Sequence, residues 1–85
     1  MLDLRSNTIN RVLNYFFLNP DSRCYLSSLA RTLKMDPGNL SKKLMEMEEE
    51  KILFSEVEGR QKYFKLNKDY PLLDEIKKIQ KLFKF

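Results

Sequence analysis

Small polar and basic residues occur between positions 36 and 43 at spacings that suit a helix docked on DNA. Leu40, Leu44 and Met47 recur at the spacing of one helical face, so they are expected to point into a core. The opposite face and its flanks then carry Gly38, Asn39, Ser41, Lys42 and Lys43. Because Asn and Lys side chains can hydrogen-bond to the edges of adenine and guanine in the major groove, this stretch predicts a base-reading helix.

Each of these five residues has its own expected contact. Gly38 has no side chain and lets the backbone approach a duplex closely, while Asn39 can pair with adenine and Lys42 with guanine O6 and N7. Ser41 can serve a base or a phosphate, and Lys43, nearer the core edge, is expected to meet a phosphate. For Gly38 the alternative is a small residue that is merely tolerated, and for the other four it is an ordinary solvated position on a helix.

A second basic group follows the turn at Gly59. Arg60 is expected to enter the minor groove, where negative potential attracts arginine, and Lys62 is expected to contact a phosphate. Arg31 and Arg23 are secondary candidates for phosphate contacts. These cations belong to two basic blocks, residues 23–43 and 59–68, each with a net charge of +4.

An acidic block lies between the two basic ones, since residues 44–58 have a net charge of −5. Its densest part is Glu46, Glu48, Glu49 and Glu50, at the expected end of a helix. One interpretation is a solvated surface, and the other is that this helix end points away from DNA. The two interpretations are compatible.

The composition limits the class of protein. A chain of 85 residues forms one domain, 1–85, and its 42% hydrophobic and 33% charged residues are typical of a globular protein. The single Cys, the lack of a membrane-length apolar run and the lack of a signal-peptide pattern predict a cytoplasmic protein without membrane contact. With no His and no Gly-rich phosphate loop, we expect no enzyme, no cofactor and no metal site.

The elements that must position these side chains can be placed from capping residues and periodicity. A first helix is expected over 6–18, ending before Pro20, and a short β-like segment over 23–26. A helix-turn-helix is expected over 27–51, with Ser27 as the first N-cap and Asp36-Pro37 restarting the second helix. A β-hairpin over 53–66 and a last helix over 71–84, opened by Pro71, complete the chain.

This order is mainly α with a small β-hairpin, α-β-α-α-β-β-α, which is the arrangement of a winged helix-turn-helix with the hairpin as its wing. Asn19-Pro20, Leu29-Ala30, Leu33 and residues 36–44 resemble the helix-turn-helix of prokaryotic ArsR/MarR-like winged-helix transcriptional regulators. The wing residues 59–67 extend the resemblance, and residues 69–72 resemble a subgroup associated with nucleotidyltransferase domains. The resemblance implies DNA binding, but not metal sensing or nucleotidyl transfer, because the residues for those chemistries are missing.

Two functions remain open. The first is sequence-specific binding of double-stranded DNA as a transcriptional regulator, expected to be a repressor, with the recognition helix in the major groove and the wing on the backbone or in the minor groove. The alternative is a winged helix that binds a protein partner, such as an adaptor of a separate nucleotidyltransferase. The acidic block and the subgroup resemblance motivate this alternative.

The two ends of the chain carry more apolar residues than a short domain needs to cover itself. A regulator that reads two half-sites usually does so as a symmetric dimer, so we expect a homodimer. The candidate interface consists of Leu2, Leu4, Ile79, Leu82, Phe83 and Phe85. The alternative for these residues is core packing within one subunit.

Overall fold

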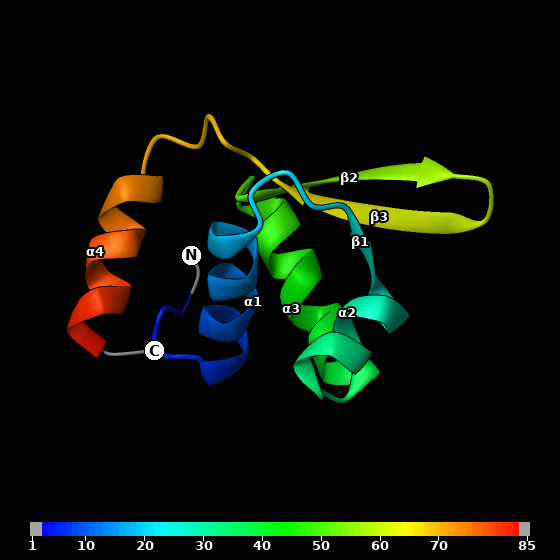
Figure 1. Cartoon of the computed structure of the whole chain (residues 1–85), viewed down its shortest axis with the longest axis horizontal. Coiled ribbons are helices and arrows are strands. Elements are labelled where there is room, and N and C mark those ends of the chain that lie inside the picture. Colours follow the sequence, from blue (N-terminus) through cyan, green and yellow to red (C-terminus); the bar gives the residue numbers. More distant parts are fainter. Residues whose placement is uncertain (1–2, 84–85) are drawn as a thin grey trace.

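The computed structural model describes residues 3–83, with Phe83 described by its backbone alone. In chain order the elements are α1 (Asn7–Leu18), β1 (Cys24–Tyr25), α2 (Leu26–Leu33), α3 (Pro37–Glu49), β2 (Leu53–Glu58), β3 (Gln61–Leu66) and α4 (Leu73–Phe83). The predicted mainly α fold with a β-hairpin is confirmed. In Figure 1 the hairpin projects to one side of the α1–α3 cluster, and α4 lies at the opposite end.

Helix α1 begins and ends as its capping residues predict. The Ile9 N–H donates to Ser6 Oγ at 3.3 Å, so Ser6 is the N-cap. The helix stops at Leu18, before Asn19 and Pro20. Its apolar stripe is fully buried and consists of Ile9, Val12, Leu13 and Phe16.

Helix α2 begins directly after a strand, and this corrects the predicted N-cap at Ser27. Tyr25 is extended because it pairs with Tyr63 in the β1–β3 ladder. Helical geometry starts at Leu26, so Ser27 lies inside the first turn. The predicted β-like segment 23–26 accordingly narrows to Cys24 and Tyr25.

Helix α3 starts where the Asp36-Pro37 pair predicts. Asp36 Oδ2 accepts a hydrogen bond from the Asn39 N–H at 2.9 Å, and Pro37 occupies the first helical position. The side chains of Leu40, Leu44 and Met47 are fully buried, as predicted. Burial of these three side chains therefore fixes the rotation of α3 about its axis.

The C-terminal end of α3 lies before the predicted position 51. Lys51 adopts a left-handed conformation with φ 67°. Its N–H donates to the Glu48 carbonyl at 2.9 Å, and the Ile52 N–H donates to the Met47 carbonyl at 3.0 Å. This pair of bonds is the Schellman arrangement that closes a helix, and it sets the direction in which β2 leaves α3.

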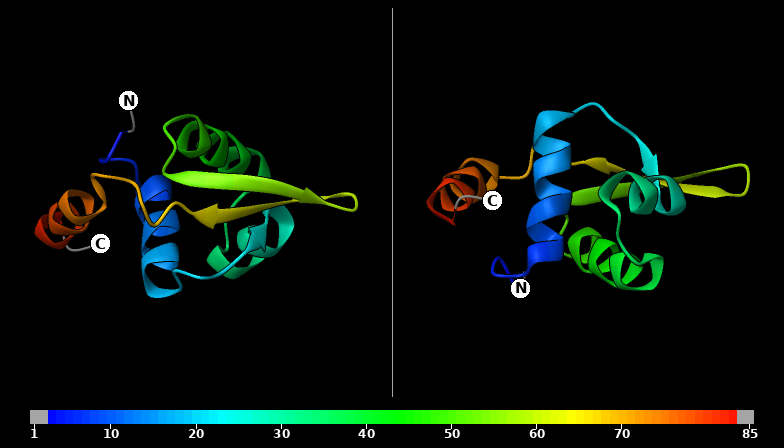
Figure 2. Two further views of the ribbon diagram at one scale, coloured as in Figure 1. Left: turned by 90° about the horizontal axis from the view of Figure 1, so that it is seen from above. Right: turned by 60° about the horizontal axis from the view of Figure 1, so that its bottom comes forward.

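The three strands form one antiparallel sheet in the order β1-β3-β2. Glu58 pairs with Gln61, so Gly59 and Arg60 form the hairpin turn, and Gly59 takes a φ of 63° that suits glycine. The base of the hairpin packs on the helices, whereas its outer part extends away from them. Both views in Figure 2 show the hairpin and α4 on opposite sides of α1.

Helix α4 begins at Leu73 and not at the predicted Pro71. The Leu73 N–H donates to the Tyr70 carbonyl at 3.2 Å, so Pro71 and Leu72 belong to a turn that leads into the helix. Leu73 and Ile76 then pack into the core.

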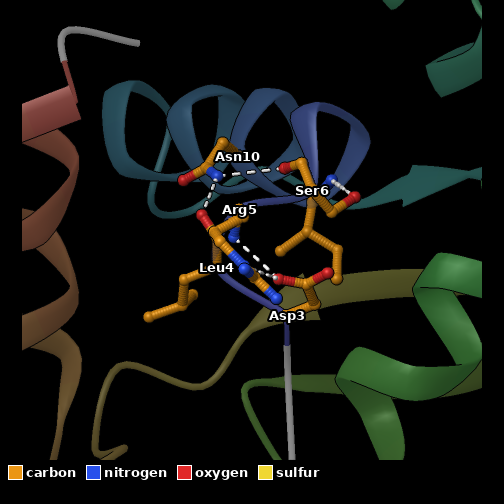
Figure 3. Close-up of polar contacts among 6 residues, drawn as sticks. Asp3, Leu4, Arg5, Ser6 and Asn10 are labelled. Carbon is orange, nitrogen blue, oxygen red and sulfur yellow. Dashed lines mark hydrogen bonds and ion pairs between the residues drawn. The ribbon is translucent and has the colours of Figure 1, made fainter.

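A buried polar contact joins α4 to α1. Gln80 Nε2 donates to Asn10 Oδ1 at 3.0 Å and to the Asn10 carbonyl at 3.2 Å. Asn10 Nδ2 in turn donates to the carbonyls of Leu4 at 2.5 Å and Ser6 at 3.0 Å, as Figure 3 shows. Satisfied buried amides specify one arrangement, so Asn10 holds the N-terminal segment and α4 against the same helix.

Candidate nucleic-acid interface

The first half of α3 presents most of the predicted base-reading residues to solvent. Gly38, Asn39 and Lys42 are exposed, whereas Ser41 and Lys43 are half-buried. This distribution follows from the buried stripe of α3, which turns the other face of the helix outward. The structure therefore places the five residues in the first half of α3, on the face opposite the buried stripe and on its flanks, as the helical periodicity predicts.

Contacts inside the chain distinguish these residues from one another. Asn39 Nδ2 donates to Thr8 Oγ1 at 3.4 Å, which places this amide toward the start of α1. Lys43 Nζ lies 3.7 Å from Glu46 Oε2. Lys42 has no ion-pair partner within residues 3–83, so its ammonium group is the cation of α3 most available to a ligand.

A groove of about 380 Å³ separates the exposed face of α3 from β3. Its lining includes Ser27, Ser41, Met45, Gln61, Lys62 and Phe64. Helix α2, helix α3 and the wing all contribute to it, and its polar groups come from all three. The groove is thus a surface at which the helix-turn-helix and the wing can contact one ligand together.

The cations of the wing are less available than their number indicates. Lys62 Nζ lies 3.1 Å from Glu48 Oε1, Lys65 Nζ lies 3.9 Å from Glu56 Oε2, and Lys68 pairs with Asp21. Among the four cations of block 59–68, only Arg60, at the exposed turn, lacks an ion-pair partner in the part of the chain that the structure describes. The net charge of block 59–68 therefore overstates the positive charge that the wing offers to an anion.

The side chain of Arg23 binds to the outer face of the wing. Its guanidinium lies 2.9 Å from Glu56 Oε1 and 2.8 Å from Glu58 Oε2, and it stacks over the Tyr63 ring at 4.3 Å. The hydrogen bond to Glu58 raises the pKa of Arg23. Tyr25 packs edge-on against Tyr63, so these aromatic residues serve hairpin packing. These contacts make Arg23 a weaker candidate for a phosphate contact than the sequence indicates.

Glu48 belongs to the acidic block at the end of α3, for which a solvated surface is one interpretation of the sequence. In the structure its carboxylate accepts a hydrogen bond from Ser55 Oγ of β2 and pairs with Lys62 of β3. The Ser55 hydrogen bond, with Lys62 beside it, lowers the pKa of Glu48, and partial burial opposes this change. Sequence spacing gives no signal for this contact, because it depends on the register of the hairpin.

Arg11 also has a role that the sequence did not indicate. Its guanidinium donates to the Leu33 carbonyl at the end of α2. Lys34 follows with a left-handed φ of 55°, and the Met35 N–H donates to the Ala30 carbonyl at 2.9 Å. These contacts close α2 and hold the helix-turn-helix against α1. Arg31, on the last turn of α2, is exposed.

The predicted dimer surface is only partly described. Leu4 is half-buried and packs against the core of its own chain, and Ile79 is half-buried beside it in an apolar cavity of about 230 Å³. Leu82 is 80% exposed. Leu2, Phe85 and the side chain of Phe83 lie outside the described residues. Leu4 therefore packs against the core of its own chain, which was the alternative to a role in the dimer interface.

Two further findings concern residues 3–83. In this part of the chain, no group of three or more His, Cys, Asp or Glu side chains is placed to hold a metal ion. The same residues include no helix with the length and apolar character needed to cross a membrane.

The fold is similar to solved regulators, although no family model and no curated protein matches the sequence. MepR, a transcription regulator of the Staphylococcus aureus multidrug efflux pump MepA, aligns with a TM-score of 0.74 and 18% identity over 93% of this chain and 60% of MepR. A possible transcriptional regulator from Methanosarcina mazei aligns with a TM-score of 0.75 and 20% identity over 95% of this chain and 72% of its own. The adhesin competence repressor AdcR from Streptococcus pyogenes aligns with a TM-score of 0.67 and 19% identity over 93% of this chain and 60% of AdcR.

The chain has a winged-helix fold. It covers about 60% of the length of MepR, one variant of which was solved bound to an oligodeoxyribonucleotide. The neighbours are MarR-type regulators, so the MarR-like part of the predicted resemblance is supported at the level of the fold. The ArsR-like part and the association with nucleotidyltransferases stay predictions.

Proposed function

We propose that this winged helix binds double-stranded DNA sequence-specifically and acts as a transcriptional regulator, specifically a repressor. The observation that carries the proposal is the exposed first half of α3, where Lys42 has no ion-pair partner within residues 3–83, beside a wing that ends in Arg60. Helix α3 would enter the major groove, and the wing would contact the backbone or the minor groove. The oligonucleotide-bound MepR variant, a structure of the same fold, supports this assignment.

Within this proposal the residues divide by task. Asn39 and Lys42 would contact base edges, whereas Ser41, Lys43 and Arg31 would contact phosphates. Gly38 would allow close approach of the backbone, and its exposed position suits this role. Arg60 would enter the minor groove, with Lys62 near a phosphate. No catalytic step is part of the proposal, and the regulator would act in the cytoplasm.

The proposal extends to a homodimer that reads two half-sites. Its support is the exposure of apolar side chains at the two ends of α4, since Leu72, just before the helix, is 52% exposed and Leu82, in its last turn, is 80% exposed. Leu2, Ile79, Phe83 and Phe85 would complete this interface, with Leu4 at its edge. Sedimentation should show a dimer at micromolar concentration that Leu82→Lys shifts toward monomer. Monomer alone for the unaltered chain would refute the dimer but not DNA binding.

The test of DNA binding is selection of bound sequences from random DNA, followed by gel-shift titration of the selected site. Lys42→Ala is expected to lose about 1–3 kcal/mol of discrimination at one base position. Arg60→Ala should weaken binding to all sequences similarly and reduce its salt dependence. Lys78→Ala is the matched control, because Lys78 is an exposed residue of α4, at the opposite end from the wing (Figure 1).

Affinity should fall steeply as salt rises, because each phosphate contact releases counterions. Failure to select any sequence at low salt would overturn the proposed function. A protein-binding module is the second candidate, favoured by the exposed Glu46 and Glu49 at the end of α3. A pull-down that returned a nucleotidyltransferase partner, together with no DNA binding, would support this candidate instead.

A further inference from the structure

A single carboxylate joins α3 to both strands of the wing. Ser55 Oγ of β2 donates to Glu48 Oε2, and Lys62 Nζ of β3 lies 3.1 Å from Glu48 Oε1. The register pairs Ser55 with Phe64 and Val57 with Lys62, so Ser55 and Lys62 point from the same face of the hairpin toward α3. Each carboxylate oxygen of Glu48 therefore contacts a different strand.

The Glu48 contact lies at the position along the hairpin beyond which the strands no longer pack against the helices. Below it, Leu53, Phe64 and Leu66 are buried against the helices. Above it, residues 56–62 are all exposed, including Val57 at 73%. A two-stranded ribbon without a packed face is only marginally ordered in water. The Glu48 contact is thus placed to limit how far the exposed tip swings relative to α3.

From this placement we propose that Glu48 is a positioning residue that fixes the wing tip, and with it Arg60, at a set distance from α3. The inference rests on the proposed DNA binding, in which α3 and the wing engage one duplex. A tip that is already held in place loses less conformational entropy on binding, and so binds more tightly. Glu48 would act through Arg60 without touching DNA.

The contacts on the other face of the hairpin cannot replace Glu48. Arg23 pairs with Glu56 and Glu58, but it precedes β1 and so ties the hairpin to its own sheet. The Glu48–Lys62 pair alone is partly exposed, and such pairs contribute at most about 1 kcal/mol. The hydrogen bond from Ser55 is therefore the main part of the contact. A test needs one substitution that keeps this hydrogen bond and one that removes it.

Two substitutions of Glu48 separate position from charge. Glu48→Gln removes the charge but keeps an oxygen that accepts from Ser55, whereas Glu48→Ala removes both. Glu48→Ala is expected to weaken binding to the selected DNA about tenfold, and Glu48→Gln to stay within about twofold of the unaltered chain. Glu49→Ala is the matched control, since Glu49 is the exposed neighbour and carries the same charge.

A double-mutant cycle then asks whether Glu48 acts through Arg60. Glu48→Ala should have little further effect in a chain that already carries Arg60→Ala, because both changes remove the same wing contact. Additive losses would overturn the proposal, as would equal affinities for Glu48→Ala and Glu48→Gln. If Glu48→Ala does not fold, Ser55→Ala takes its place, and it should show the same lack of additivity with Arg60→Ala.

A measurement without DNA keeps this test independent of the proposed function. Backbone order parameters of Gly59 and Arg60, from NMR relaxation, should fall toward the flexible range below about 0.6 in Glu48→Ala. They should stay unchanged in Glu49→Ala. Unchanged order at the tip of Glu48→Ala would refute the positioning role whether or not the chain binds DNA. Failure of the unaltered chain to bind DNA would refute only the proposed function.

Discussion

The first half of α3 and the wing border the groove from two sides and both carry cations, but the two elements are held in place by different forces. Helix α3 is fixed from below by Leu40, Leu44 and Met47, all without solvent exposure. The outer part of the wing has no such support and is held by polar contacts at the surface, chiefly those of Glu48 and Arg23. Apolar packing therefore sets the position of α3, whereas electrostatic contacts set the position of the outer part of the wing.

This difference has a consequence for binding. Apolar packing is not weakened by ionic screening, whereas exposed ion pairs weaken as salt rises. The orientation of α3 should therefore persist under conditions that loosen the wing. Base reading by α3 and backbone contact by the wing would then have different sensitivities to salt and pH.

The largest expected effect comes from breaking the packing beneath α3. Leu44→Ala removes a fully buried side chain and should lower the free energy of unfolding by about 2–5 kcal/mol, from lost burial and the cavity left behind. Met45→Ala, one position along and 60% exposed, should change it by less than about 0.5 kcal/mol. Urea denaturation measures both. Similar losses for the two variants would mean that α3 is not positioned by its buried face.

A smaller effect is expected at the start of α3. Asp36→Ala removes the side chain that accepts from the Asn39 N–H and should cost about 1 kcal/mol of stability. Asp36→Asn keeps an acceptor and should retain most of it. Thermal unfolding compares the three proteins. DNA affinity should follow the same order, because the residues expected to contact DNA begin two positions after the cap.

Those parts of the fold that depend on local sequence could be predicted. The Asp36-Pro37 start of α3, the end of α1 before Pro20 and the buried stripe of α3 all follow from capping, sterics and periodicity. The start of α2 could not, because pairing of Tyr25 with Tyr63 decides it, and these residues are far apart in the chain. The predicted N-cap at Ser27 was wrong for this reason.

The same limit applies to the candidate site. Counting charges located the basic wing, but it could not show that Lys62, Lys65 and Lys68 are each paired with an acidic residue. Those partners come from α3, β2 and the loop after α1, and only the folded chain brings them together. Charge patterning therefore indicates the class of ligand, while the pairing pattern indicates which cations are free to meet it.

The smallest expected effect concerns the titration of Glu48 at the wing. Its pKa is lowered from the ordinary value of 4.5, because Ser55 and Lys62 stabilise the carboxylate in the folded state. A group with a lowered folded pKa contributes stability above its unfolded pKa, and this contribution is lost as pH falls through the folded pKa. The free energy of unfolding should therefore decline as pH falls below 4.5, by about 1 kcal/mol or less from this contact.

Glu48→Gln should reduce that decline, since it removes the titrating group and keeps the acceptor for Ser55. Glu49→Gln removes the same charge from the exposed neighbouring position and should leave the decline as it is. Urea unfolding at a series of pH values from 6 to 3 compares the three proteins, with the range chosen to span about one to two units on either side of the ordinary pKa. Equal slopes for Glu48→Gln and the unaltered chain would mean that the charge of Glu48 does not stabilise the wing. The contrast between a packed helix and an electrostatically held wing would then fail.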